Sequence, residues 1–289
     1  MTDPRPVLRF APSPTGYLHI GHAFSALFTA QAAHRLHGRF LLRIEDTDAT
    51  RCRAEYEAAI YEDLAWLGIE WEEPVRRQSG NLADYAASLE ALRALGLVYA
   101  CFASRREIAE AAGRLGPDWR RDPAGAPLYP GLHRGADPQS AAARIAAGEP
   151  YALRLDIGKA LALLDSPLTF DSLDDTGETR GATAHPERWG DVLLASRDRP
   201  ASYHLAVVTD DALQGVTHIT RGADLLAATD IHRLLQVLLG LHGPLYCHHR
   251  LILDPSGRKL AKSARDKSLR SLRAEGTTAA AIRQQLGFD

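Results

Sequence analysis

Hydrophobic and polar positions in the first fifty residues form two short apolar runs around one amphipathic stretch. Residues 7–10 predict a strand, which segment 11–16 cannot continue because its two prolines lack the N–H that a strand donates. Apolar residues at helical spacing over 24–36 predict a helix with Gly38 as its C-cap, and residues 40–44 predict a second strand. This order predicts a parallel pair with a right-handed crossover and a ligand site at the carboxyl ends of the strands.

The middle of the chain separates into regular and irregular parts. Helical spacing predicts helices at about 53–67 and 83–95. From about 99 to 188 the periodicity is weak, and Ala, Arg, Pro and Gly dominate, which is typical of a subdomain inserted between two halves of an α/β domain. Apolar runs at 191–196 and 203–208 then predict strands, the second of them buried on both faces.

The last part of the chain adds a helix and a strand. An amphipathic pattern predicts a helix from about Ala223 to Leu239. A final strand is predicted at 250–253, and the turn 254–257 follows it with proline at its second position. The whole pattern predicts an α/β protein with parallel strands.

Composition excludes several classes of protein. The chain has 289 residues, 45% hydrophobic and 24% charged, which is ordinary for a globular protein and unlike a disordered one. Its longest apolar run, 97–103, is far shorter than the about 18 residues of a membrane helix, and its start does not resemble a signal peptide. Three widely spaced cysteines predict no disulfide framework, so we expect a cytoplasmic protein with no membrane partner.

Net charge is close to zero but unevenly distributed. The chain carries 34 Lys and Arg against 36 Asp and Glu, a net charge of −2. Residues 250–289 hold nine basic and four acidic side chains, a local charge of +5. A basic end of this kind is either a solvated face or a surface that contacts phosphates.

Two small constellations carry candidate chemistry. His19 and His22 lie three residues apart at the mouth of the first predicted helix, where N–H groups and the helix dipole favour anions, and Gly21 between them permits close approach. Lys259 and Lys262 follow the turn 254–257 and can neutralise phosphate charge. Each constellation alone also fits ordinary surface residues, whereas the pair indicates a polyphosphate site.

The amino-acid sequences of these segments resemble motifs of one enzyme family. The sequences RFAPSPTG at 9–16 and HIGH at 19–22 are similar to the opening of the class I aminoacyl-tRNA synthetases specific for glutamate. KLAKS at 259–263 resembles their second motif, with Ala261 where the family usually has serine. The similarity continues through three further segments, 43–48, 203–211 and 219–225.

The resemblance implies a reaction and its phosphate-binding residues. In this family the α-carboxylate of an amino acid attacks the α-phosphorus of ATP, giving an acyl-adenylate and pyrophosphate, and positioning and charge stabilisation suffice. His19, His22 and Lys262 would be the catalytic residues. ATP would be bound by these three with Gly21, Lys259 and Ser263, and Mg²⁺ would accompany it.

The resemblance also implies an amino-acid pocket for L-glutamate. Arg9 and Arg221 would bind its two carboxylates, Glu45 its ammonium group, and Tyr203 would supply a hydroxyl donor. Which arginine binds which carboxylate stays open. The full set of implied glutamate-binding residues is Arg9, Phe10, Ala11, Pro12, Ser13, Glu45, Tyr203 and Arg221.

Length separates two branches of the family. Only 26 residues follow Ser263, whereas the full-length enzymes carry a large anticodon-binding region after this motif. The short form resembles stand-alone paralogues that activate glutamate without tRNA and attach it to the queuosine base of tRNA(Asp). Two alternatives stay open: a truncated enzyme that charges tRNA(Glu), and a non-catalytic paralogue that binds ATP or RNA. The oligomeric state is not predicted.

The resemblance implies a class I synthetase fold, with a Rossmann-type doubly wound parallel sheet. We expect residues 1–98 to form the first half of the catalytic domain and 99–189 to form an inserted subdomain like those that bind an acceptor end. Residues 190–263 would form the second half, with the KLAKS loop. Residues 264–289 would be a short basic helical end, without an anticodon-binding domain.

The short paralogues often hold structural zinc, through Cys-x-Cys followed by Tyr-x-x-x-Cys. Here Cys101 is followed by Ala103 in place of the second cysteine, and Tyr129 is followed by His133 in place of the last. Cys101, Tyr129 and His133 supply three ligands, whereas tetrahedral structural zinc normally takes four. We therefore expect no metal site, and local packing in its place.

Overall fold

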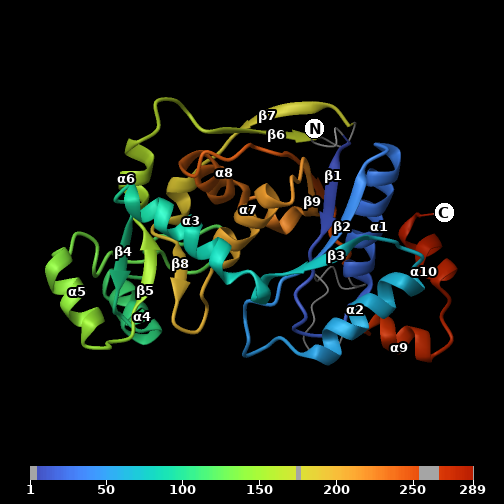
Figure 1. Cartoon of the computed structure of the whole chain (residues 1–289), viewed down its shortest axis with the longest axis horizontal. Helices are drawn as coiled ribbons and strands as arrows, with labels where there is room; N and C mark the ends of the chain where they lie inside the picture. Colours follow the sequence, from blue (N-terminus) through green and yellow to red (C-terminus); the bar gives the residue numbers. More distant parts are fainter. Residues whose placement is uncertain (1–4, 174–176, 254–266, 289) are drawn as a thin grey trace.

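The computed structural model describes residues 5–173, 177–253 and 267–288 (Figure 1). The strands of the described part are β1 (Val7–Phe10), β2 (Arg39–Ile44), β3 (Glu72–Arg77), β4 (Val98–Cys101), β5 (Ala152–Leu155), β6 (Thr169–Leu173), β7 (Thr179–Thr183), β8 (Leu193–Ser196), β9 (His218–Gly222) and β10 (Leu245–His249). The α-helices are α1 (Ile20–Arg35), α2 (Ala54–Trp66), α3 (Leu82–Ala94), α4 (Arg105–Arg114), α5 (Pro138–Ala146), α6 (Ile157–Ala162), α7 (Tyr203–Leu213), α8 (Thr229–Leu238), α9 (Leu269–Ala274) and α10 (Ala279–Leu286). None of the described helices is long and apolar enough to cross a membrane.

The first parallel sheet has the order β1-β2-β3. β1 pairs with β2 from Val7 opposite Arg39 to Phe10 opposite Leu42, and α1 connects the two strands. The predicted strand–helix–strand unit is therefore confirmed. β3 was not predicted, because its sequence EEPVRR is charged and only partly buried, and therefore shows no hydrophobic pattern.

A second sheet has the order β7-β6-β10-β9, in which β9, β10 and β6 are parallel and β7 is antiparallel. β1 lies beside β9, where the Thr217 N–H donates to the Val7 carbonyl at 3.0 Å. β1 and β9 are therefore neighbours, with β2 on the far side of β1 and β10 on the far side of β9. The connection from β1 to β2 and that from β9 to β10 thus run in opposite directions. Such a reversal of strand order leaves a crevice at the carboxyl ends of the strands.

A third sheet, β4-β5-β8, is antiparallel and lies with α4 and α5 at one end of the molecule (Figure 1). Its strand β8 comes from the predicted second half of the catalytic domain. Conversely, β6 and β7 come from the predicted insertion but belong to the second sheet. The division of the chain at residues 98 and 189 stays a prediction.

The strand predicted at 203–208 is wrong, because this segment forms the start of α7. The Ser202 hydroxyl accepts a hydrogen bond from the Leu205 N–H and caps the helix. Residues 205–211 are all buried, since α7 packs between α3 and α8. A short apolar run buried on every side has the same sequence pattern in a helix as in a buried strand.

Three other predicted boundaries move. The strand expected at 250–253 lies earlier, as β10, and the helix expected from Ala223 begins as a short 3-10 turn before α8. Gly38 is not the C-cap of α1, which is Leu36. A Cβ on Gly38 would lie 2.6 Å from the Pro6 carbonyl oxygen, so glycine is needed here for close approach of the backbone. The turn predicted at 254–257 lies outside the described residues.

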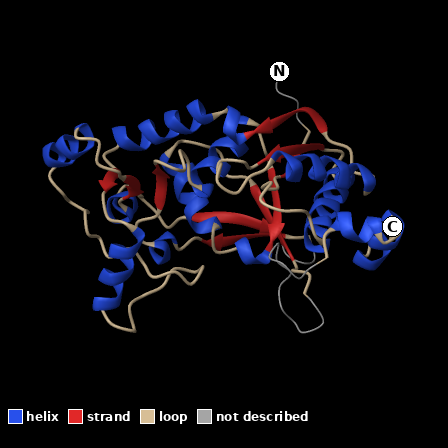
Figure 2. Ribbon diagram, turned by 90° about the horizontal axis from the view of Figure 1, so that it is seen from below, coloured by secondary structure: helices blue, strands red, loops and turns tan. Residues whose placement is uncertain are grey.

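The C-terminal helices close one of two apolar cores. Leu269, Ile282 and Phe288 are buried with side chains of β1, β2, α1 and α2. The Phe288 ring lies 5.4 Å from that of Phe24 in α1. α9 and α10 therefore form the end of the molecule opposite α4 and α5 (Figures 1 and 2). The helical C-terminal end that was predicted is confirmed within the described residues.

Candidate active site

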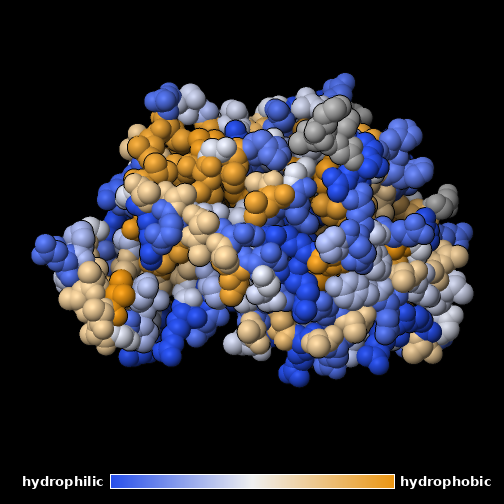
Figure 3. All heavy atoms as spheres, in the orientation of Figure 1, coloured by the Kyte–Doolittle hydropathy of each residue, from blue (hydrophilic) through white to orange (hydrophobic). Residues whose placement is uncertain are grey.

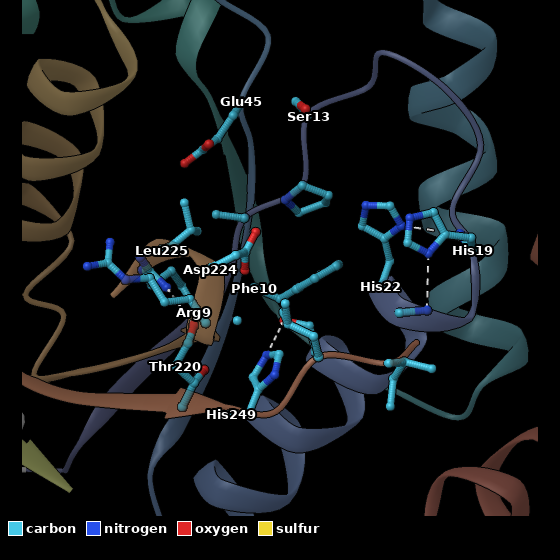
Figure 4. Close-up of a pocket in the computed structure, with 18 of the residues that line it drawn as sticks. Arg9, Phe10, Ser13, His19, His22, Glu45, Thr220, Asp224, Leu225 and His249 are labelled. Atoms are coloured by element: carbon cyan, nitrogen blue, oxygen red, sulfur yellow. Dashed lines mark hydrogen bonds between the residues drawn. The ribbon is translucent and has the colours of Figure 1, made fainter. Parts of the chain in front are cut away.

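A cavity of about 640 Å³ opens at the carboxyl ends of β1, β2, β9 and β10 (Figure 4). This is the crevice that the reversal of strand order predicts. The cavity is lined by every predicted site residue that the structure describes: Arg9, Phe10, Ala11, Pro12, Ser13, His19, Gly21, His22, Glu45, Tyr203 and Arg221. The predicted Lys259, Lys262 and Ser263 lie outside the described residues, as does Ala261.

His19 and His22 hold each other at the start of α1. His19 is the N-cap, and its Nδ1 accepts the Gly21 N–H at 3.1 Å, while His22 Nδ1 accepts the His19 N–H at 3.2 Å. Since both Nδ1 atoms are acceptors, each neutral ring carries its proton on Nε2. The two rings, 3.8 Å apart, lie together at one end of the cavity, with Arg9 at the other (Figure 4). This end suits phosphate groups.

Arg9 is buried and paired with a carboxylate. Its Nε and Nη2 donate to the two carboxylate oxygens of Asp211 at 2.8 and 3.2 Å, and Nη1 donates to the Thr220 carbonyl. Arg43 donates to the same carboxylate at 2.8 Å. Burial alone would raise the pKa of Asp211, but Arg9 and Arg43 together hold it below its ordinary value. The charge of Arg9 is therefore already compensated within the protein.

Arg221 is equally buried, but its hydrogen-bond partners among the described residues are neutral. Its Nε, Nη1 and Nη2 donate to His248 Nε2, His232 Nδ1 and Thr229 Oγ1, at 3.1, 2.9 and 2.6 Å. No carboxylate of the described residues lies within ion-pair distance of this guanidinium. A buried cation without a counter-charge is costly, and an anionic ligand removes that cost.

The Glu45 carboxylate projects into the same cavity from the end of β2 (Figure 4). The backbone fixes its position, because the Glu45 N–H donates to the Pro12 carbonyl at 3.0 Å. Burial raises the pKa of Glu45, and the guanidinium groups of Arg43 and Arg9 oppose that rise. Tyr203 contributes a buried hydroxyl from α7. Besides the guanidinium groups of Arg9 and Arg221, the Glu45 carboxylate and the Tyr203 hydroxyl, the lining of the cavity includes Asp224 and Arg250. The imidazole groups of His19 and His22 lie at the other end (Figure 4).

Sequence reasoning missed residues that support the cavity. His249 lines it and is held by Ser25 Oγ on Nε2 at 3.0 Å and by the Arg250 carbonyl on Nδ1. Asp211 lies inside a segment that the resemblance covers, but its local sequence predicts no role for it. His232 and His248 come from α8 and β10, and nothing in their local sequence pattern signals a partner at Arg221.

The residues at the expected zinc position do not fit a four-ligand site. Cys101 donates from Sγ to the Tyr129 hydroxyl at 3.2 Å, and Tyr129 accepts the His133 N–H. The His133 ring instead packs against Phe102, 5.6 Å away. Among the described residues, no three His, Cys, Asp or Glu side chains are grouped to hold a metal ion. A subdomain held by packing instead of zinc stays a prediction.

Comparison with known proteins gives consistent results. The family described as class I tRNA synthetases (E and Q), catalytic domain, matches residues 7–287. The chain is 45% identical over 98% of its length to the whole of a glutamyl-Q tRNA(Asp) synthetase from Rhodobacter capsulatus. It is 38% identical to another from Nitratidesulfovibrio vulgaris, over 95% of this chain and 83% of that one.

Longer relatives match over about half of their length. A glutamate tRNA ligase from Parasynechococcus marenigrum is 36% identical over 95% of this chain and 56% of its own. The crystal structure of a glutamate tRNA ligase from Elizabethkingia meningosepticum superposes with a TM-score of 0.73 at 27% identity, covering 94% of this chain and 53% of that one. The α/β fold expected from the sequence is therefore confirmed.

Proposed function

The chain belongs to the family of class I tRNA synthetases for glutamate and glutamine, and from that premise we propose that it activates L-glutamate with ATP in the absence of tRNA. It then transfers the glutamyl group to the queuosine base in the anticodon of tRNA(Asp). In this proposal the reaction takes place in the cytoplasm. The observation that carries the proposal is Arg221, a buried cation with neutral partners in a cavity that also holds Glu45.

Glutamate fits this cavity as a zwitterion with an acidic side chain. Arg221 binds the side-chain carboxylate, and Arg9, whose charge Asp211 compensates, orients the α-carboxylate by hydrogen bonds. The Glu45 carboxylate accepts a hydrogen bond from the ammonium group, and the Tyr203 hydroxyl donates a hydrogen bond to the substrate. Phe10, Ala11, Pro12 and Ser13 form the wall beside them.

ATP lies toward the start of α1 in this proposal. The Nε2–H groups of His19 and His22 donate to phosphate oxygens, and the small Gly21 lets the phosphates approach. An α-carboxylate oxygen of glutamate forms a bond to the α-phosphorus of ATP. The bond from the α-phosphorus to the oxygen that bridges it to the β-phosphorus breaks, and pyrophosphate leaves with that oxygen. Lys259, Lys262 and Ser263 bind the leaving side. Mg²⁺ would be held by the phosphates of ATP together with water, and would neutralise part of their charge.

RNA reaches the cavity from the notch between α4 and α5 and the rest of the molecule (Figure 3). α4 exposes Arg105, Arg106 and Arg114, which suit phosphate contacts. The basic C-terminal end supplies further contacts. A single-stranded anticodon base can be unstacked and inserted into a pocket, which an acceptor base in this position requires. The match to the whole of a short relative supports this branch over one that charges tRNA(Glu).

Exchange of labelled pyrophosphate into ATP tests the first step. Without tRNA, we expect exchange with L-glutamate and none with L-glutamine, since a neutral amide leaves the Arg221 charge uncompensated. Arg221→Met should raise the KM for glutamate at least about tenfold, because a hydrogen-bonded charge pair is lost. The matched control is Arg233→Met, which changes an α8 arginine that lies outside the cavity. Exchange that needs tRNA, or that prefers glutamine, would contradict the proposal.

A further inference from the structure

The guanidinium of Arg221 is held by hydrogen-bond acceptors from two elements. His232 and Thr229 belong to α8, and His248 belongs to β10. They accept from Nη1, Nη2 and Nε respectively, so that each nitrogen has one protein partner. Together these contacts fix the plane of the group, and Arg221 lines the cavity. The orientation of Arg221 therefore depends on side chains that are not in its own strand.

The tautomers of the histidines follow from the guanidinium itself. Arginine only donates, so His232 must accept at Nδ1 and carry its proton on Nε2. That Nε2 lies 3.1 Å from Nδ1 of His204, which therefore accepts in turn. His204 and His232 also pack against the Tyr203 ring, with centroids 5.5 and 5.4 Å away. A continuous chain of contacts thus connects Arg221 with Tyr203, two residues of the proposed glutamate pocket.

These histidines are neutral at physiological pH. Burial, and then the charge of Arg221, lower the pKa of His248 to about 3 and that of His204 to about 4. The same two effects, with further neighbouring cations and histidines, hold the pKa of His232 well below its ordinary value. Neutral imidazoles accept a hydrogen bond without compensating a positive charge. Asp211 does the opposite for Arg9, since its carboxylate accepts and compensates at once.

We propose that His232 and His248 are positioning residues that aim Arg221 at a glutamate carboxylate and leave its charge for the substrate, with His204 holding His232 in place. The inference rests on the proposed function, because glutamate is the ligand it names. It assigns part of the preference for glutamate over glutamine to residues that touch neither. A carboxylate in place of either acceptor would compensate Arg221 and weaken that preference.

His248 allows the sharpest test, because it is only partly buried and its accepting atom is Nε2. Glutamine places a neutral oxygen near that position, glutamate places a charged one, and leucine places none. In pyrophosphate exchange with the full chain, we expect H248Q to keep the KM for glutamate within about threefold. We expect H248E and H248L each to raise it about tenfold or more, with the KM for ATP within about twofold.

Two variants of His232 give an independent comparison. Asparagine mimics an accepting Nδ1, so H232N should keep the KM for glutamate within about threefold, whereas H232L should raise it about tenfold. H242L is the matched control, because His242 bonds the Val216 carbonyl outside the cavity. Thermal unfolding of every variant checks the fold. If H232L does not fold, the comparison of H248Q with H248E decides alone, because these two side chains have nearly the same size.

Two outcomes would overturn the inference and are distinct from failure of the proposed function. One is equal KM for glutamate in H248Q and H248E. The other is a rise in the KM for ATP as large as that for glutamate in the leucine variants, which indicates a general loss of structure. If the wild-type protein shows no glutamate-dependent exchange, the proposed function fails, and this inference with it.

Discussion

Two arginines with the same charge face the cavity with different partners. Arg9 shares a buried carboxylate with Arg43, whereas the acceptors around Arg221 are neutral. A compensated guanidinium orients a ligand by hydrogen bonds, and an uncompensated one attracts its charge as well. At the scale of single residues, the proposed function therefore assigns selectivity for an acidic substrate to Arg221, which has no carboxylate partner in the part of the chain that the structure describes.

A second buried charge has consequences for stability. The Asp63 side chain in α2 has no exposed surface, and neither of its oxygens accepts a hydrogen bond from the described residues. Burial raises its pKa to about 6, although Arg273, 3.6 Å away, opposes the rise. The folded state thus disfavours the ionised form. As the pH rises from about 4 to about 6, the unfolded chain loses this proton before the folded protein does. The free energy of unfolding therefore falls over this range.

Asp63→Asn should consequently stabilise the protein above pH 6. The amide does not ionise, so we expect the free energy of unfolding at pH 7.5 to rise by about 1–2 kcal/mol relative to the wild-type protein. At pH 4.5 the difference should shrink toward zero. Denaturant unfolding at both pH values measures it, with Glu70→Gln, a change at an exposed carboxylate, as control. A difference that does not depend on pH would refute this account of Asp63.

At the scale of elements, the start of α1 depends on the small size of Gly21. A Cβ at this position would lie 3.0 Å from Cε1 and 3.1 Å from Nδ1 of the His19 ring, which is tighter than ordinary van der Waals contact. The ring would have to turn, and its hydrogen bond with the Gly21 N–H would weaken. Both effects change where the imidazole donors point.

Gly21→Ala should therefore lower the rate of pyrophosphate exchange by about tenfold, as expected when a hydrogen bond to a charged phosphate group is lost. Gly113→Ala in α4 is the matched control, because a Cβ there meets nothing within 4 Å and alanine favours the helix. That variant should keep its exchange rate and unfold at a slightly higher temperature. Equal rates in both variants would show that Gly21 has no role at the site.

The elements that the sequence predicts well are those whose two faces differ in polarity. α1 and α2 pack one apolar face on a core, so their spacing alone identifies them. α7 is buried almost all round, so its apolar run predicts a strand where the structure has a helix. β3 has the opposite problem, because a partly exposed, charged strand shows no pattern at all. Burial by neighbouring elements decides these cases, and local sequence does not contain it.

At the scale of the whole molecule, the topology brings the site together. The described residues implied by the family motifs come from β1, α1, β2, α7 and β9, and all of them line one cavity, because the strands end at the same edge. The residues that hydrogen-bond to these site residues come from distant parts of the sequence or lie outside the motifs. Asp211 lies 202 residues from Arg9 in the sequence, and His248 lies 27 from Arg221. No motif marks such pairs, so only the folded structure connects them.

At the same scale, the known relatives are of two lengths. The chain matches a short relative from end to end and spans about half the length of the curated glutamate tRNA ligases that it matches. Its C-terminal helices cover the core formed by α1 and α2. In the proposed function the anticodon base itself enters the cavity.

Transfer of labelled glutamate to purified tRNA tests this most directly. The protein, ATP and glutamate are incubated with tRNA(Asp) that carries queuosine, with tRNA(Asp) that lacks it, and with tRNA(Glu). We expect stable labelling only of the queuosine-containing tRNA(Asp), and we expect the label to survive removal of the 3′-terminal nucleotide. Labelling of tRNA(Glu) at its 3′ end, or equal labelling of tRNA(Asp) with and without queuosine, would contradict the account.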